Sequence, residues 1–224
     1  MKKTLTILLL SALPVMGGCT NWIRMIAIIF APDEQSQTVE ANYRDYKALA
    51  KHSLAVVVYH SMRVQYDYPD AREWVTRAIA AKFGEKEVRA EIKGLHVISP
   101  GAVLKYQEEN LHWDDLEKTQ LGKALGADYV LFVALSEFTT REPASIYQLQ
   151  GLVTAEISLY KTLLPEREAR VFKGDDIRVL NPKNTPGGVP GYDDRKIRED
   201  MIKEFAEKVV WKFYKHDEKT EDQS

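Results

Sequence analysis

The stretch Leu121–Leu135, LGKALGADYVLFVAL, combines a helix, a helix stop and a strand. Its first residues place apolar side chains at helical spacing, and Asp114 followed by Glu117 predicts a capping box at the start of that helix. Gly126 is a residue type that ends helices with a positive φ. From Asp128 onward the side chains are apolar on both alternating faces, which is typical of a strand covered on both sides. The stretch therefore predicts a helix that leads into the central strand of a sheet.

Two shorter strands are predicted before this stretch. Leu54–Tyr59 is a continuous run rich in β-branched residues, and Leu95–Ile98 is a second brief apolar run. Between them, Pro69–Phe83 repeats apolar residues at spacings of three and four, which predicts a helix. Ala102–Glu109 predicts a short helix after the second strand. This half of the chain thus alternates strands and helices.

The second half changes pattern. Gln148–Tyr160 alternates apolar and polar residues, which predicts a strand with one core face and one wet face. Glu168–Leu180 predicts a further strand with a bulge or bend at 174–176, and the Pro/Gly-rich stretch Asn181–Gly191 predicts a loop without regular structure. A final amphipathic helix is expected over Asp193–Tyr214. The expected fold class is α/β (α+β), with a single mixed β-sheet in the order β-α-β-α-β-β-β-α and helices packed on the sheet.

Composition excludes several classes of function. The 224 residues include one cysteine, so neither an internal disulfide nor a metal site of several thiolates can form. The hydrophobic share of 45% and the net charge of −2 are those of an ordinary globular protein. With no basic excess, nucleic acid is not an expected partner.

The N-terminus has the order of a secretory signal. Met1-Lys2-Lys3 is basic, the following run to Val15 is apolar and too short to span a bilayer, and small residues precede Cys19. The stretch VMGGCT, residues 15–20, resembles the lipobox of bacterial lipoproteins. That resemblance implies cleavage between Gly18 and Cys19, a diacylglycerol on the Cys19 sulfur, and acylation of the new amino group with a fatty acid such as palmitate.

The lipobox pattern has one departure, because Met16 stands where leucine is usual. The alternative is an ordinary signal peptide that leaves Cys19 as a free thiol. Attachment of two or more acyl chains would meet the requirement for stable anchoring in a membrane. Thr20, in place of aspartate, resembles the sorting choice for the outer membrane, so we expect an outer-membrane lipoprotein facing the periplasm.

A second apolar segment, residues 22–31, follows the cysteine. It is about half as long as a membrane-spanning helix and carries Arg24. It either lies in the membrane interface or packs on the folded domain, and a polar tether, Pro32–Glu40, follows it. The expected organisation is a signal peptide (1–18), a lipidated N-terminus with apolar segment and tether (19–41), an α/β periplasmic domain (42–215) and a disordered charged tail (216–224).

The phrase LGKALGADYVL, together with the order of elements, resembles a loose group of envelope proteins. The group comprises the N-terminal domain of TolB, the curli-secretion lipoprotein CsgG, the flagellar lipoprotein FlgO and the LpoB activator of penicillin-binding proteins. The resemblance implies an interaction module that binds an envelope protein partner and can oligomerise. A pore like that of the curli member is not expected, because the hairpin it would need, Asp128–Leu180, belongs to the sheet. The phrase is a scaffold motif and carries no catalytic or binding residue.

No catalytic signature stands out in the sequence, so we expect no enzyme activity, no cofactor and no metal. The five histidines are scattered: His52, His60, His96, His112 and His216. Three acidic pairs, at 114–115, 175–176 and 193–194, are expected to cap helices or form turns. The alternative is a small-molecule- or glycan-binding envelope protein, possibly a hydrolase, that uses Asp175, Asp176 and a nearby histidine. Sheet edges and loops are the expected docking surfaces.

Overall fold

The computed structural model describes residues 36–142, 145, 147–185, 187–191 and 193–219. The chain divides into two compact units. The larger unit is Thr38–Glu218, and the smaller consists of Met1–Gln37 with Lys219–Ser224. The larger unit contains the whole main sheet and the helices packed on it.

The described residues form the elements expected from the sequence and several short additions. The strands are β1 (Ser36–Val39), β2 (Ser53–His60), β3 (His96–Val97), β4 (Tyr129–Arg141), β5 (Gln148–Lys161), β6 (Arg170–Lys173), β7 (Ile177–Asn181), β8 (Val189–Pro190) and β9 (His216–Lys219). The α-helices are α2 (Met62–Asp67), α3 (Ala71–Phe83), α4 (Lys86–Glu91), α5 (Pro100–Glu109), α6 (Lys118–Leu125), α7 (Glu166–Ala169) and α8 (Arg195–Trp211). Two 3₁₀ turns are η1 (Tyr46–Leu49) and η2 (Trp113–Asp115).

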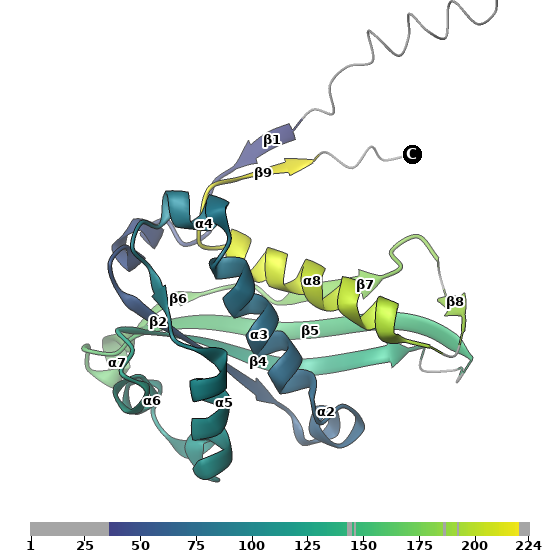
Figure 1. The fold of residues 1–224 in the computed structure, drawn as a ribbon, viewed down its shortest axis with the longest axis horizontal. Coiled ribbons are helices and arrows are strands. Elements are labelled where there is room, and N and C mark those ends of the chain that lie inside the picture. Colours follow the sequence, from purple (N-terminus) through teal and green to yellow (C-terminus); the bar gives the residue numbers. More distant parts are fainter. Residues whose placement is uncertain (1–35, 143–144, 146, 186, 192, 220–224) are drawn as a thin grey trace, which may run out of the picture. The chain divides into compact units, whose positions relative to one another are not determined.

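The main sheet is mixed, which confirms the expected fold class. Its strand order is β3-β2-β4-β5-β6, and β7 and β8 also pair with β5 (Figure 1). β2 lies parallel to both β3 and β4, because the helices between them carry the chain back across the sheet. β4 and β5 pair antiparallel over most of their length. β6 and β7 pair with successive parts of β5, so the expected bend at 174–176 separates two strands.

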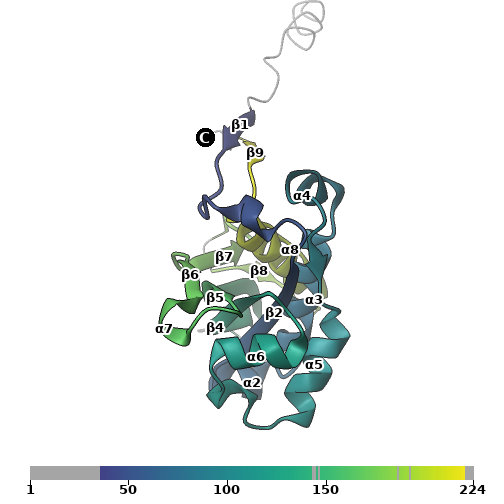
Figure 2. The same ribbon diagram turned by 90° about the vertical axis from the view of Figure 1, so that its left-hand side faces the viewer.

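Both faces of the sheet are covered at β2, which explains why the sequence of this strand is apolar throughout. Leu54, Val56 and Val58 face the larger core, which includes α3 and α8. Figure 1 shows these two helices lying across the strands. Ala55 and Val57 face a smaller core formed with α5, α6 and η2. Figure 2 shows α5 and α6 toward the viewer.

The stretch that leads into β4 has the expected structure. α6 ends at Gly126, whose φ of 66° lies in the left-handed region. Asp128 then binds Ser53 at the start of β2: its carboxylate accepts from the Ser53 N–H and hydroxyl, both at 2.8 Å, and its own N–H donates to Ser53 Oγ at 2.9 Å. These hydrogen bonds from Ser53, together with His52, lower the pKa of the Asp128 carboxyl. The turn thus fixes the register of two neighbouring strands.

The start of α6 differs from the expectation. The capping interaction involves Glu117 and Gln120, with the Gln120 side chain accepting from the Glu117 N–H at 3.3 Å, and Asp114 lies in η2. Trp113 is buried in the smaller core, and its packing holds 113–115 in a separate 3₁₀ turn. The helix therefore begins at Lys118.

Several short elements were not predicted, among them α2, α4, α7, β1, β8 and β9. β8 lies inside the Pro/Gly-rich stretch expected to be irregular, where Val189 and Pro190 pair with the first residues of β5. β9 occupies the first residues of the expected disordered tail, and β1 occupies part of the expected tether. These two strands pair with each other, and the Thr38 hydroxyl donates to the Asp217 carboxylate at 2.8 Å. Within the described residues, no helix combines the length and apolar character needed to cross a bilayer.

Candidate functional site: a cationic pocket at the β3 edge

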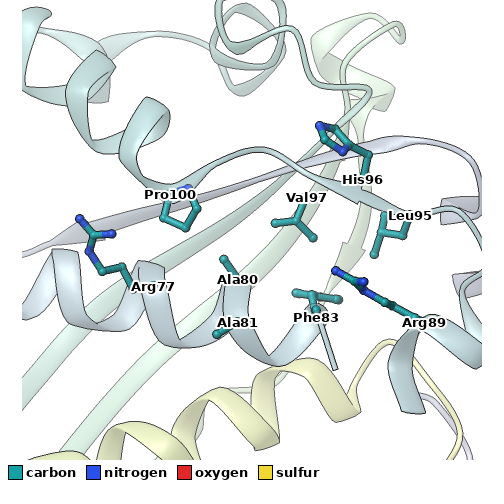
Figure 3. A pocket seen from close by; sticks show the side chains of 10 residues that line it. Arg77, Ala80, Ala81, Phe83, Arg89, Leu95, His96, Val97 and Pro100 are labelled. Carbon is teal, nitrogen blue, oxygen red and sulfur yellow. The ribbon is translucent and has the colours of Figure 1, made fainter. Parts of the chain in front are cut away.

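A pocket of about 560 Å³ lies at the edge of the sheet, between α3, α4 and β3. The C-terminal half of α3 and the chain from Leu95 to Pro100 form its walls (Figure 3). Its lining residues are Arg77, Ala80, Ala81, Phe83, Gly84, Arg89, Leu95, His96, Val97 and Pro100. Small and apolar side chains form part of the interior, and the charged groups come from the two arginines.

The two arginines lie at opposite ends of the pocket. Figure 3 shows Arg77 at the end near Pro100 and Arg89 at the end near Leu95. The Arg77 Nε donates to Glu73 at 2.8 Å, which leaves its terminal N–H groups available for other acceptors. Arg89 forms no ion pair with any residue that the structure describes. No acidic residue is among the lining residues, so the pocket favours an anionic group.

Arg89 is held over the C-terminal end of α3. A Cβ built on Gly84, the residue that ends α3, would lie 3.8 Å from Arg89 Nη2. A cation at this end of a helix is favoured by the helix dipole. α4 supplies Arg89, and Val88 of the same short helix is buried in the larger core, which fixes α4 beside the pocket.

The edge strand presents free backbone to this pocket. β3 pairs with β2 through the His96 N–H to His52 and the Ile98 N–H to Leu54, both at 2.9 Å. Backbone groups alternate in direction along a strand, so the N–H and C=O of Val97 face away from β2. No described strand pairs with that side of β3. The pocket therefore has a backbone donor and acceptor beside its two guanidinium groups.

A second hollow, of about 470 Å³, lies between α3 and α8. Trp74, Ala78 and Ile202 supply apolar surface to it, and Arg77 and Ala81 line both this groove and the pocket. Charged side chains of both signs surround the groove. Burial lowers the pKa of the Lys82 amine, but its contacts with Glu85 and Glu207 outweigh that effect, so the pKa is raised.

A polar network joins α2, β4 and α8 at a third hollow. The Thr140 hydroxyl donates to Asp194, and the Tyr68 hydroxyl accepts from the Thr140 N–H at 3.0 Å. Arg198 binds the other oxygen of Asp194 at 3.3 Å and lies 4.4 Å from the centre of the Trp74 ring. Because each member of the network has a hydrogen-bond partner inside the fold, we interpret the network as structural: it holds these three elements together.

Of the groups in the alternative hydrolase hypothesis, the structure brings Asp176 and His216 to one pocket but does not bring Asp175 there. Asp176 and His216 line a small pocket of about 310 Å³ together with Arg178, whereas Asp175 is not among its lining residues. The His216 ring stacks on Trp211 with ring centres 4.6 Å apart, and its Nδ1 lies 3.1 Å from Tyr214 O. The two neighbouring aspartates therefore do not form a paired-carboxylate site.

The predicted lipid-attachment residue Cys19, the cleavage position at Gly18 and the apolar segment 22–31 lie outside the described residues. Within the part of the chain that the structure describes, no group of three or more His, Cys, Asp or Glu side chains could hold a metal ion. Of the histidines, His96 reaches the rim of the cationic pocket, and His60 is buried beside α2, where burial lowers its pKa.

Sequence reasoning did not identify Arg77 and Arg89. Arg77 is a solvent-face residue of an amphipathic helix, and Arg89 belongs to a helix that was not predicted. The expectation that sheet edges serve as docking surfaces indicated this region of the fold, but not these two residues.

Comparison with known proteins adds resemblances of low similarity. No protein-family model and no curated protein matches the chain. Among solved structures, the PelC dodecamer from Paraburkholderia phytofirmans is 12% identical over 81% of this chain and 98% of that chain, with a TM-score of 0.43. Lipoprotein GNA1162 from Neisseria meningitidis is 17% identical over 71% and 98% of the two chains, with a TM-score of 0.39. The LpoB C-terminal domain from Salmonella enterica is 11% identical over 58% and 83%, with a TM-score of 0.30. Values this low do not carry fold or function from one chain to another.

Proposed function

We propose that this chain is a lipid-anchored protein of the bacterial cell envelope, whose α/β domain is a non-catalytic module that binds another protein. In this proposal Cys19 carries the lipid, and the domain faces the periplasm from the outer membrane. The bound partner docks at the cationic pocket beside β3.

The proposed anchor rests on the sequence around Cys19. A basic start, an apolar run and small residues lead to the one cysteine of the chain. An exported protein with a single free thiol would carry a reactive group, whereas acylation gives that cysteine a function.

The proposed interaction rests on one observation, the open edge of β3. An edge strand with unpaired backbone is a template for another chain. β3 is short, two residues, and no described strand pairs with its outer side. Here the edge adjoins a hollow with apolar walls and two cationic side chains. The apolar side chains offer contact area to a bound partner, and the guanidinium groups fix its orientation. Binding sites typically combine these two features.

The test is photocrosslinking in intact cells that produce the full chain. A benzophenone amino acid replaces His96 at the pocket rim in one variant and Lys105 on the exposed side of α5 in another. We expect a discrete protein adduct from the His96 position and none from the Lys105 position. Equal labelling from both positions, or no adduct from His96, would contradict the proposal.

A further inference from the structure

We propose that the cationic pocket binds an extended, acidic peptide segment of a partner protein, which adds as a strand to the open edge of β3. This inference rests on the proposed function and specifies its partner. The segment would pair with the Val97 backbone and place a carboxylate against Arg77 or Arg89.

The backbone of Val97 defines the mode of binding. Its N–H and C=O face away from β2, while its side chain packs against the larger core. A peptide in extended conformation can satisfy both groups, as in recognition by strand addition. α3 runs alongside β3 and closes the other side of the groove, so the peptide would lie between an edge strand and a helix (Figure 3).

The charges define the chemistry of the peptide. Arg89 has no ion-pair partner among the described residues, and Glu73 occupies one N–H group of Arg77. A guanidinium group binds a carboxylate with two parallel hydrogen bonds, which fixes its direction as well as its charge. A basic peptide would meet the charge of Arg89, the charge of Arg77 that Glu73 partly balances, and no acidic lining residue.

The size of the pocket sets the length of the segment. Arg77 and Gly84 stand near its two ends on α3, and a helix rises about 1.5 Å per residue, so they are roughly 10 Å apart along the helix axis. An extended chain covers about 3.3 Å per residue, so the pocket takes about three residues. A side chain pointing toward either end would then reach one arginine.

Two pairs of variants separate this mode of binding from a general effect of substitution. Val97→Pro removes the outward N–H and places a ring where the added strand would lie, but leaves the hydrogen bonds of β3 to β2 in place. Val97→Ala also shortens the side chain, but keeps the N–H. Arg89→Glu reverses a charge inside the pocket, and Lys86→Glu makes the same change on α4 outside it.

The experiment is a selection of random twelve-residue peptides, displayed on phage, against the full chain in detergent micelles. Selected peptides are then synthesised, and their binding to each variant is measured by fluorescence anisotropy. We expect the selected peptides to be enriched in Asp and Glu, with binding weakened at least tenfold by Val97→Pro and Arg89→Glu. Lys86→Glu should change binding by less than threefold, and Val97→Ala, which keeps the N–H, should bind at least threefold more tightly than Val97→Pro. Circular dichroism checks whether Val97→Pro is folded. If it is not, Arg89→Glu, which changes an exposed side chain, supplies the test.

Several results would overturn this inference: selected peptides without acidic residues, no selected peptide at all, or equal binding to Val97→Pro and Val97→Ala. Loss of self-association in the same variants, without peptide binding, would identify a second copy of the chain as the occupant and would also overturn it. If the crosslink from His96 persists in Arg89→Glu and Val97→Pro, the proposed protein-binding function is retained, but the inference that an acidic peptide adds as a strand to β3 is wrong. If the crosslink never forms, the proposed function itself fails.

Discussion

Replacement of Gly122 by alanine should destabilise the protein, although Gly122 lies inside a helix. In a helix interior, alanine is normally favoured over glycine by about 0.5–1 kcal/mol. Here a Cβ on Gly122 would overlap the Thr162 hydroxyl and lie 2.9 Å from Thr162 Cγ2. Thr162 is held in place, since it is 4% exposed and its hydroxyl donates to the Ala127 carbonyl at 2.6 Å. The contact of α6 with the end of β5 thus requires a residue without a side chain.

The magnitude follows from opposing effects. Overpacking costs about 1–3 kcal/mol, and subtracting the gain in helix propensity leaves Gly122→Ala destabilising by roughly 1 kcal/mol. Thr162→Ala loses one buried hydrogen bond, at a cost of about 1 kcal/mol. In the double variant the contacts with the Thr162 hydroxyl and Cγ2 are gone and the Cβ of residue 162 remains 3.0 Å from the added Cβ, so the free energy of unfolding should be close to that of Thr162→Ala alone.

The assay is urea unfolding of the wild type, both single variants and the double variant. We expect the two substitutions to be coupled by about 1 kcal/mol, which is more than the roughly 0.3–0.5 kcal/mol within which independent effects add. If Gly122→Ala raises the free energy of unfolding, or if the two effects simply add, the packing argument is refuted.

Three further substitutions test the account of the fold. Gly126→Ala should lower the free energy of unfolding, measured in urea, by about 1 kcal/mol. Nothing lies within 4 Å of the added Cβ, so the cost comes from the φ of 66°, which alanine tolerates poorly. Gly126→Asn should cost less, because asparagine adopts this conformation more readily, and equal losses would contradict the backbone argument. Phe205→Ala, at a fully buried position in the larger core, should cost about 3–5 kcal/mol, whereas an effect below about 1 kcal/mol would show that α8 is not packed as described. Asp128→Asn should lower stability at neutral pH, and its deficit relative to wild type should shrink in thermal unfolding as the pH falls. The reason is that the pKa of the Asp128 carboxyl is lower in the folded protein than in the unfolded chain. The stabilisation that the carboxylate supplies is therefore fully present above a pH of about 4 and is lost as the pH falls through the folded pKa. A stability deficit of Asp128→Asn that stays constant down to pH 2 would contradict this.

The parts of the fold that were predicted from the sequence have strong local patterns. The run after Asp128 is apolar on both faces because β4 is central, and it pairs with β2 on one side and β5 on the other. The alternating residues of β5 from Leu149 to Leu159 are buried on one face, as expected. In these elements local preference and tertiary packing agree.

The parts that were missed are short or depend on distant contacts. α2 has six residues, although Ser61 before it gives a signal, since its side chain accepts from the Val64 N–H at 3.4 Å. Asp114 matches a capping pattern, but burial of Trp113 places it in a different turn. In both cases the outcome depends on packing that a local pattern does not contain.

The cationic pocket could not be predicted for the same reason. Its arginines come from α3 and α4, and its free backbone comes from β3. Those segments meet because the connection from β2 to β3 returns the chain across the sheet edge. Taken separately, each residue has an ordinary environment: a helix surface, a short helix and an edge strand.

The central claim, attachment to the membrane through Cys19, is tested most directly by the intact mass and membrane fractionation of the full chain, with wild type and Cys19→Ala expressed side by side. We expect the mature wild type to begin at Cys19, to carry added acyl mass and to stay with the membrane fraction, and we expect Cys19→Ala to leave it. A wild-type protein with a free thiol that is recovered in the soluble fraction would contradict the account.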